Sequence, residues 1–247
     1  MEKRPYLSIV IPAYNEEDRL PPTLKKILQY FKKQKYSWEI IVIDDGSRDK
    51  TSQVVKNFIK DNKNIRLVRQ KNTGKGGAVK NGILHCWGEY VLMTDADLST
   101  PIEELKKFWP KIKKGCSIVT GSRGVRGAKI LRHQKPIREL FGKIFGGLSR
   151  LLVLDDLIDT QCGFKLFKGD LARKIFQKLW TKSAIWELEI FYHATKEGAK
   201  IAEVPVVWIH DQQTRIPYNL QKAVGIFTEL LKIKWRYKIW SPVKVRK

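Results

Sequence analysis

Residues 90–97 read YVLMTDAD, an apolar run that leads directly into two carboxylates, Asp95 and Asp97. The run favours a buried strand over residues 90–94. Where the backbone stays extended, residues two apart point to the same side, so both carboxylates would lie together. Neighbouring carboxylates repel unless a cation lies between them, and Mg²⁺ commonly binds one or two carboxylates together with substrate phosphates. The pattern therefore predicts a metal site, with a solvated turn or the N-cap of a helix that begins near residues 99–101 as the alternative.

Three further apolar runs precede this strand and alternate with helical patterns. The predicted strands are residues 7–11, 39–43 and 65–69, and the predicted helices are residues 24–31 (after Pro21 and Pro22), 51–60 and 77–87. This alternation argues for an α/β fold with an open, mostly parallel sheet flanked by helices. Because ligands of such sheets bind beyond the carboxyl ends of the strands, the polar residues that follow each strand are the candidate site.

Three more polar turns follow predicted strands. Asp44 and Asp45 suit hydrogen bonds to a base or a ribose, and they also fit a turn that caps the next helix. Tyr14 fits stacking on a base or covering of the sheet end. Residues 72–77, NTGKGG, open a helix with backbone N–H groups and Lys75, which suits a phosphate, although they match neither a Walker nor a Rossmann motif. Each signal is weak alone, and their occurrence at successive strand ends strengthens all four.

The rest of the first 217 residues is predicted to complete the same domain. Its elements are a strand at 117–120, a long loop at 121–138, a helix at 139–154, a turn-rich segment at 155–169, a helix at 185–196 and a strand at 201–209. Residues 218–247 form a basic amphipathic C-terminal segment in which Trp235, Tyr237 and Trp240 alternate with cations. A helix in a membrane interface and a terminal helix packed on the core both fit this pattern, and residues 232–239 also fit a strand.

Composition limits the partners and the compartment. With 48 Lys and Arg against 25 Asp and Glu, the formal net charge is +23, which favours nucleic acid, anionic lipid or phosphorylated substrates. The basic residues are scattered and match no nucleic-acid motif, so no nucleic-acid partner is expected. The spacing of the 3 cysteines fits neither a disulfide framework nor a zinc site, which indicates a reducing compartment. We find neither a signal peptide nor an apolar run near the ~20 residues of a membrane span.

The motifs in order resemble those of inverting family-2 glycosyltransferases with the GT-A fold. They are IPAYNEE, VIDDGSRDKT, NTGKGGAVKNG, MTDADLSTP, GSR and DTQCGFKLF, within residues 7–208. More narrowly they resemble the polyprenyl-phosphate branch, most of all the dolichyl-phosphate β-glucosyltransferases, with the dolichyl-phosphate mannose synthases as close relatives. Ser99 stands where the mannose branch often has a Gln that helps to bind the metal, which favours the glucosyl branch.

The resemblance implies roles for individual residues. It implies that Asp95 and Asp97 hold the metal and the donor diphosphate, and that Arg123 and Arg138 bind the acceptor phosphate; Asp97, Arg123 and Arg138 are the expected catalytic residues. The expected nucleotide-sugar-binding residues are Pro12, Ala13, Tyr14, Glu16, Asp44, Asp45, Lys75 and Asp95.

The reaction implied is metal-dependent, inverting transfer of a hexose from a nucleotide sugar to polyprenyl or dolichyl phosphate. Mg²⁺ or Mn²⁺ is the expected cofactor, and UDP-glucose is the favoured donor. GDP-mannose is the alternative donor, and a sugar hydroxyl is the alternative acceptor, for which Glu187 would be the base. We expect a cytoplasmic protein that attaches peripherally, through its basic C-terminal segment, to the anionic cytoplasmic face of a membrane.

Overall fold

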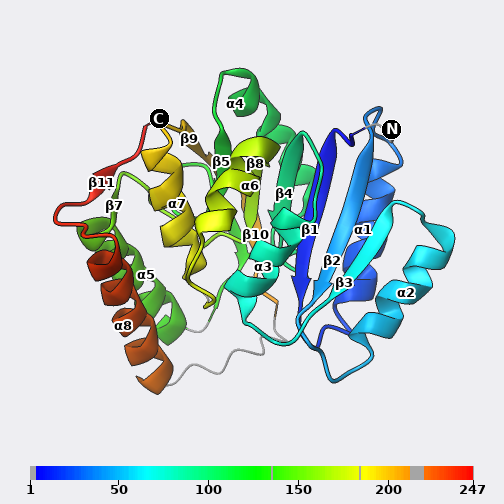
Figure 1. Cartoon of the computed structure of the whole chain (residues 1–247), viewed down its shortest axis with the longest axis horizontal. Coiled ribbons are helices and arrows are strands. Elements are labelled where there is room, and N and C mark those ends of the chain that lie inside the picture. Colours follow the sequence, from blue (N-terminus) through cyan, green and yellow to red (C-terminus); the bar gives the residue numbers. More distant parts are fainter. Residues whose placement is uncertain (1–3, 135, 184, 212–219, 247) are drawn as a thin grey trace.

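A seven-stranded sheet forms the centre of the computed structural model, which describes residues 4–134, 136–183, 185–211 and 220–246 (Figure 1). In spatial order its strands are β3 (Ile65–Arg69), β2 (Trp38–Asp44), β1 (Leu7–Ala13), β4 (Tyr90–Thr94), β8 (Phe164–Lys168), β5 (Ile118–Ser122) and β9 (Ile201–Pro205). The strands are parallel except β8, which is antiparallel to both of its neighbours. The prediction of an open, mostly parallel α/β sheet is confirmed.

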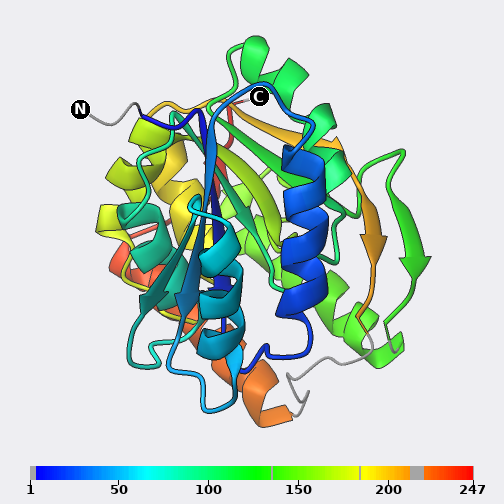
Figure 2. The same cartoon turned by 90° about the vertical axis from the view of Figure 1, so that its right-hand side faces the viewer.

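Helices cover both faces of this sheet (Figures 1 and 2). The helices of the described residues are α1 (Leu20–Phe31), α2 (Thr51–Asp61), α3 (Lys75–Leu84), the 3₁₀ helix η1 (Ile102–Lys107), α4 (Trp109–Lys113), α5 (Pro136–Leu152), α6 (Gly169–Lys178), α7 (Trp186–Lys196) and α8 (Leu220–Arg236). In α1, Pro21 and Pro22 fall in the first turn, where their missing N–H groups are not needed. The helix then buries Leu24, Ile27 and Phe31 at helical spacing against the sheet.

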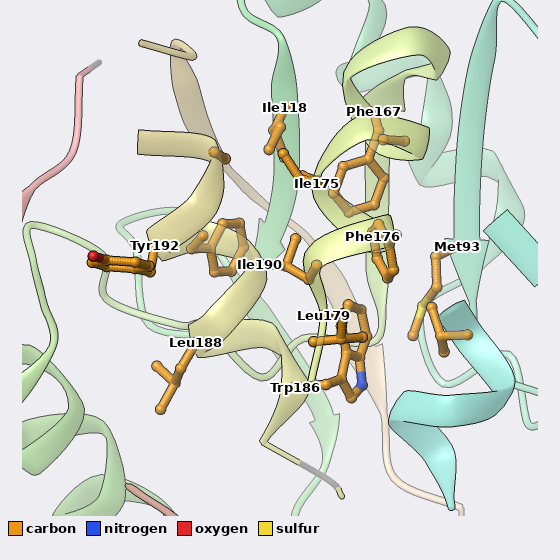
Figure 3. Packing of buried hydrophobic residues seen from close by; sticks show 14 of the residues in the cluster. Met93, Ile118, Phe167, Ile175, Phe176, Leu179, Trp186, Leu188, Ile190 and Tyr192 are labelled. Atoms are coloured by element: carbon orange, nitrogen blue, oxygen red, sulfur yellow. The ribbon is translucent and has the colours of Figure 1, made fainter. Parts of the chain in front are cut away.

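Two apolar clusters lie on the two faces of the sheet, which explains why its strands are apolar without interruption. Successive strand residues alternate between the clusters: Ile9 and Ile11 belong to the cluster under α1, whereas Val10 belongs to the cluster under α3, α6 and α7. Figure 3 shows the second cluster, in which Phe176 of α6 packs on Trp186 of α7 with ring centroids 5.5 Å apart. Because the two clusters cover both faces of the sheet, the polar turns lie at its edge.

The second half of the chain departs from the sequence prediction in three places. The segment predicted as turn-rich contains β8, whose apolar run is interrupted by Lys165, a lysine that is buried in an ion pair. The predicted long loop contains β6 (Lys129–Arg132), which pairs with β10 (Val207–Ile209), so the strand predicted at 201–209 is divided into β9 and β10. Helix α6 was not predicted.

The C-terminal segment returns to the body of the molecule. After α8 the chain reverses at Lys238, which has a positive φ of 49°, and β11 (Val243–Lys244) pairs with β7 (Leu154–Asp155). Leu230, Ile233 and Ile239 are buried in the cluster that also contains α7. The predicted boundary between residues 217 and 218 lies outside the described residues, and within them no helix is both long and apolar enough to cross a bilayer.

Candidate active site

The site is built where β1, β2 and β4 end and β8 begins. The backbone N–H of Asp45 donates to the carbonyl of Ala13 over 2.9 Å, which ties the end of β2 to the end of β1. The N–H of Asp95 donates to the carbonyl of Gly163 over 3.2 Å, which ties the end of β4 to the start of β8. The residues predicted from four separate motifs therefore lie along one edge of the sheet.

Asp95 and Asp97 form an incompletely neutralised pair of carboxylates. Their side chains are 30% and 23% exposed. The Lys75 Nζ lies 2.8 Å from Asp95 Oδ1, and the Ser99 N–H donates to Asp97 Oδ1 over 2.9 Å. Burial, followed by the charge of Asp95, raises the pKa of Asp97 above its ordinary value. The pair thus favours a further positive charge.

Gly163 is required directly behind this pair. A Cβ at this position would overlap the carboxylate of Asp95, so any other residue would displace Asp95. The glycine of the motif DTQCGFKLF therefore contributes to the site by having no side chain, which leaves room for Asp95.

The loop that carries Lys75 packs closely against the backbone of Lys182. Gly74 has φ +86°, and a Cβ on it would lie 2.6 Å from the carbonyl oxygen of Lys182. The Gly76 N–H donates to that same carbonyl over 3.0 Å. Although burial opposes it, the carboxylates of Asp95 and Glu187 raise the pKa of Lys75 above its ordinary value, so Lys75 is a cation.

Asp44 and Asp45 both shape the chain around the site. Asp44 is fully buried and accepts hydrogen bonds from the Ser47 N–H (2.8 Å) and the Ser52 hydroxyl. Asp45 accepts the N–H groups of Thr73 (2.8 Å) and Gly74 (2.9 Å). Asp45 therefore anchors the Lys75 loop to β2.

The turn after β1 presents an exposed aromatic ring and a buried carboxylate. Tyr14 is 42% exposed, whereas Glu16 is buried in a two-pronged ion pair with Arg19. Arg19 Nη1 also lies 3.1 Å from Asp211 and 4.0 Å from Asp97 Oδ2. Sequence reasoning missed Arg19, although it lies three residues after Glu16, a spacing that brings side chains together in a helical turn.

Arg123 lies on the other side of Asp95, at the end of β5. Its Nε and Nη2 donate to the two carboxylate oxygens of Asp159 over 2.7 and 2.9 Å, and its guanidinium carbon lies 5.4 Å from the centroid of the Trp208 ring. Trp208 and Asp95 line the same small recess. Although burial opposes it, the Arg123 hydrogen bonds hold the pKa of Asp159 below its ordinary value. The side chain of Arg138, in α5, lies outside the described residues.

Glu187 and Glu189, two residues apart on α7, differ in environment. Glu187 is buried 3.5 Å from the Nζ of Lys165, and burial raises its pKa in spite of the charges of Lys165 and Lys75. Glu189 is also buried, yet hydrogen bonds from His193, Tyr237 and the backbone lower its pKa to about 2. Lys165 and Asp159 were not predicted, and only their places in the motif DTQCGFKLF could have indicated them.

The residues present fit a divalent cation bound together with a ligand. No group of three or more His, Cys, Asp or Glu capable of holding a metal occurs among the described residues. Two partly exposed carboxylates that repel one another are, however, the oxygen donors that Mg²⁺ or Mn²⁺ shares with phosphates. Asp95 and Asp97 would supply the protein's part of that coordination.

Known proteins show the class to which this fold and site belong. Residues 8–176 match the model of glycosyl transferase family 2, and the chain belongs to that family. It is a glycosyltransferase with the GT-A fold.

The chain is most informatively compared with curated relatives named dolichyl-phosphate beta-glucosyltransferase. It is 37% identical to that of Dictyostelium discoideum, over 94% of this chain and 75% of the relative, and 33% identical to that of Homo sapiens, over the same shares. A solved structure of glucosyl-3-phosphoglycerate synthase from Mycobacterium tuberculosis, in complex with Mn²⁺, UDP and glucosyl-3-phosphoglycerate, superposes with a TM-score of 0.66 at 17% identity, over 94% of this chain and 79% of that one. The family and the branch indicated by the sequence motifs are confirmed.

Proposed function

We propose that this glycosyltransferase transfers glucose from UDP-glucose to dolichyl or another polyprenyl phosphate, with inversion at the anomeric carbon and with Mg²⁺ or Mn²⁺. The observation that carries the proposal is the arrangement of charges along one sheet edge: the Asp95–Asp97 pair with Lys75 on one side, and Arg123 on the other. The names of the curated relatives support the sugar and the acceptor.

The donor would lie across the ends of β1, β2 and β4. Tyr14 offers an exposed ring for the base, with Pro12 and Ala13 forming the backbone floor beside it. Asp44, Asp45 and Glu16 already accept hydrogen bonds from other residues of the protein. We therefore propose that they shape the nucleoside site by holding its backbone. Lys75 would move from Asp95 toward the diphosphate, where it neutralises charge on the leaving group.

Asp95 and Asp97 would hold the metal ion. When bound, it supplies Lewis-acid stabilisation of the leaving diphosphate. The contribution of the chain is to hold both carboxylates in place: the Ser99 N–H donates to Asp97, and Gly163 leaves room for Asp95.

The acceptor phosphate would bind at Arg123. Asp159 occupies Nε and Nη2, which fixes the plane of the guanidinium and leaves Nη1 directed to donate elsewhere. Arg138 is the second proposed ligand of this phosphate. A phosphate monoester has a second pKa of about 6, so it is largely ionised at neutral pH and attacks without a protein base. Direct attack in line with the leaving diphosphate inverts the anomeric carbon.

The environment of Glu187 favours a phosphate acceptor over a hydroxyl acceptor. Glu187 is 1% exposed and paired with Lys165, so its carboxylate is turned into the protein. Glu187→Gln separates the two readings: a hydroxyl acceptor requires Glu187 as base and the variant would lose activity, whereas a phosphate acceptor leaves kcat within about tenfold of wild type.

We also propose peripheral attachment at the cytoplasmic face of a membrane. Helices α5 and α8 lie side by side at one end of the molecule (Figure 1). Ile137, Leu140 and Leu151 of α5 are more than half exposed, and Trp235 at the end of α8 is 70% exposed. Together with the net charge of +23, these side chains suit an anionic lipid surface, where each cation contributes on the order of 1 kcal/mol.

The test is a transfer assay with purified protein, Mg²⁺ or Mn²⁺ and dolichyl phosphate in detergent. Radiolabelled UDP-glucose and GDP-mannose are supplied in parallel, and the label extracted into organic solvent is counted. Label from UDP-glucose alone is the expected result. Label from GDP-mannose alone would move the chain to the mannose branch, and lipid-bound label from neither would contradict the proposed acceptor.

A further inference from the structure

Glu189 is a fully buried carboxylate to which the proposed reaction assigns no role. It is fully buried on α7, and it accepts the backbone N–H groups of Trp180 over 2.7 Å and of Thr181 over 2.8 Å. His193 Nε2 lies 3.6 Å from it. Burial alone would raise the pKa of Glu189, yet these donors and Tyr237 lower it to about 2. Glu189 is therefore a carboxylate that stays charged and holds segment 180–182 by its backbone.

The end of α8 reaches the same carboxylate from the opposite side. The hydroxyl of Tyr237 donates to Glu189 Oε1, and the His193 Nε2 lies 3.3 Å from that hydroxyl. The guanidinium carbon of Arg236 lies 4.8 Å from the centroid of the Trp180 ring. Two consecutive residues of the C-terminal segment thus fix segment 180–182, one through Glu189 and one by direct contact.

Segment 180–182 in turn forms the wall of the Lys75 loop. The Lys182 carbonyl accepts the Gly76 N–H over 3.0 Å. Added Cβ atoms would lie 2.6 Å from that carbonyl oxygen at Gly74 and 2.7 Å from the Thr181 carbonyl oxygen at Gly76. Because the two backbones are this close, a shift of Thr181 or Lys182 toward the loop would displace it, and a shift away would weaken the Gly76 hydrogen bond.

We propose that Glu189 and Tyr237 are positioning residues that hold the backbone of the Lys75 loop in place beside Asp95, and so couple the C-terminal segment to binding of the donor diphosphate. The coupling runs from Tyr237 to Glu189, then through the backbone of segment 180–182 to Gly76, and ends at the Lys75–Asp95 contact of 2.8 Å. The part of the proposal that concerns the diphosphate rests on the proposed function.

The decisive variant is Tyr237→Phe, which removes one hydroxyl and keeps the ring. Its matched control is Tyr192→Phe: the Tyr192 ring packs 4.9 Å from that of Tyr237, but its hydroxyl makes none of the contacts described for Glu189. Two quantities are measured on the full chain. One is the Kd of UDP in the presence of Mn²⁺, by titration calorimetry, and the other is the hydrogen-exchange rate of the Gly76 amide without any ligand.

In Tyr237→Phe we expect the Kd of UDP to rise by roughly fivefold or more, in the range of ordinary coupling between sites. We also expect faster exchange of the Gly76 amide, because its carbonyl partner is less firmly held. Tyr192→Phe should leave both unchanged. An unchanged Kd with unchanged Gly76 exchange in Tyr237→Phe would overturn the proposal, as would equal effects in both variants.

Failure of the donor assignment gives a different result. If the wild-type chain binds no UDP, the proposed donor is wrong, and Gly76 exchange alone then decides whether Tyr237 holds the loop. Steady-state kinetics add a distinction from general destabilisation. A positioning role raises the KM for UDP-glucose more than it lowers kcat and leaves the KM for dolichyl phosphate unchanged, whereas a loosened fold alters all three.

Discussion

The side of the site proposed for the donor and the side proposed for the acceptor differ in how their charges are neutralised. On the donor side, formed by the ends of β1, β2 and β4 and the Lys75 loop, Asp95 and Asp97 lie together and share the nearby cations Lys75 and Arg19. On the proposed acceptor side, at the end of β5, the Nε and Nη2 of Arg123 donate to the two carboxylate oxygens of Asp159. The proposed donor side would therefore be completed by a ligand cation, whereas on the proposed acceptor side Asp159 already neutralises Arg123.

The surroundings of the two sides also differ in polarity. The donor side is lined by hydrogen-bonded polar turns, such as the one in which Asp45 holds Thr73 and Gly74. Helices α5 and α8, at one end of the molecule (Figure 1), expose large apolar side chains, Leu151 at 67% and Trp235 at 70% among them. A water-soluble, highly charged donor and a lipid acceptor would each meet surroundings of their own kind.

Asp97→Asn gives the largest expected effect and tests the donor side. Turnover should fall by roughly 10³-fold, because a ligand of the metal ion that would stabilise the leaving diphosphate is lost. The melting temperature at neutral pH should rise, since burial and Asp95 raise the pKa of Asp97, and ionised Asp97 therefore costs stability that is recovered as the pH falls through that pKa. Activity is measured by lipid-bound label and stability by thermal melting, with Asp61→Asn on exposed α2 as control. Retained activity would remove Asp97 from the metal site.

Glu189→Gln tests the connection from the C-terminal segment to the Lys75 loop, through the pH dependence of folding stability. With a pKa near 2 against an ordinary 4.5, Glu189 contributes roughly 3 kcal/mol of stability above pH 4.5, and this contribution is lost as the pH falls toward 2. The variant should be less stable at neutral pH and should lose less stability on acidification than the wild type. Urea unfolding at pH 6 and pH 3 measures both, and Glu103→Gln on the exposed surface is the control. Equal acid sensitivity in Glu189→Gln and wild type would contradict the assigned hydrogen bonds.

Arg123→Ala tests the acceptor side. The KM for dolichyl phosphate should rise roughly 10- to 150-fold, as for a lost charge-assisted hydrogen bond, while the Kd of UDP stays constant. The melting temperature should also fall, because Asp159 keeps a buried charge without its partner. Arg126→Ala, on an exposed residue of the same loop, separates this effect from general loss of charge, and Arg138→Ala tests the second proposed ligand. A change in donor affinity alone would place Arg123 on the donor side.

The smallest expected effect concerns the outer surface of the acceptor side. Trp235→Ser with Trp240→Ser should lower partitioning onto anionic liposomes about three- to tenfold, because partial burial of each ring is worth on the order of 1 kcal/mol or less. Both rings are at least 70% exposed, so the fold should be unaffected. Trp87→Ser, a matched exposed tryptophan near the N-terminal part of the sheet, is the control in flotation assays. Undiminished flotation would remove the C-terminal segment from the membrane contact.

The donor side could be predicted from the sequence because its strands and their polar turns are local and consecutive. Buried parallel strands are continuous apolar runs, and Asp44 and Asp95 follow them directly. The acceptor side depends on pairing between residues that are distant in the sequence. Arg123 and Asp159 are 36 residues apart, and the buried Lys165 of β8 pairs with Glu187 of α7. An apolar pattern cannot show such a strand, since its charge is neutralised only in the folded chain.

The central place of β8 also affects how the chain folds during synthesis. Strands β3, β2, β1 and β4 are made within the first 94 residues, and their order in the sheet leaves β4 at its open edge. The strand that covers β4 ends at Lys168, so at ordinary translation speeds of about 5–20 residues per second the edge stays uncovered for roughly 4–15 s. During that interval β4 is paired with β1 on one side only, and its other edge offers backbone groups on which another chain can assemble. The strand that leads into the carboxylate pair is thus also an edge open to aggregation until β8 is made.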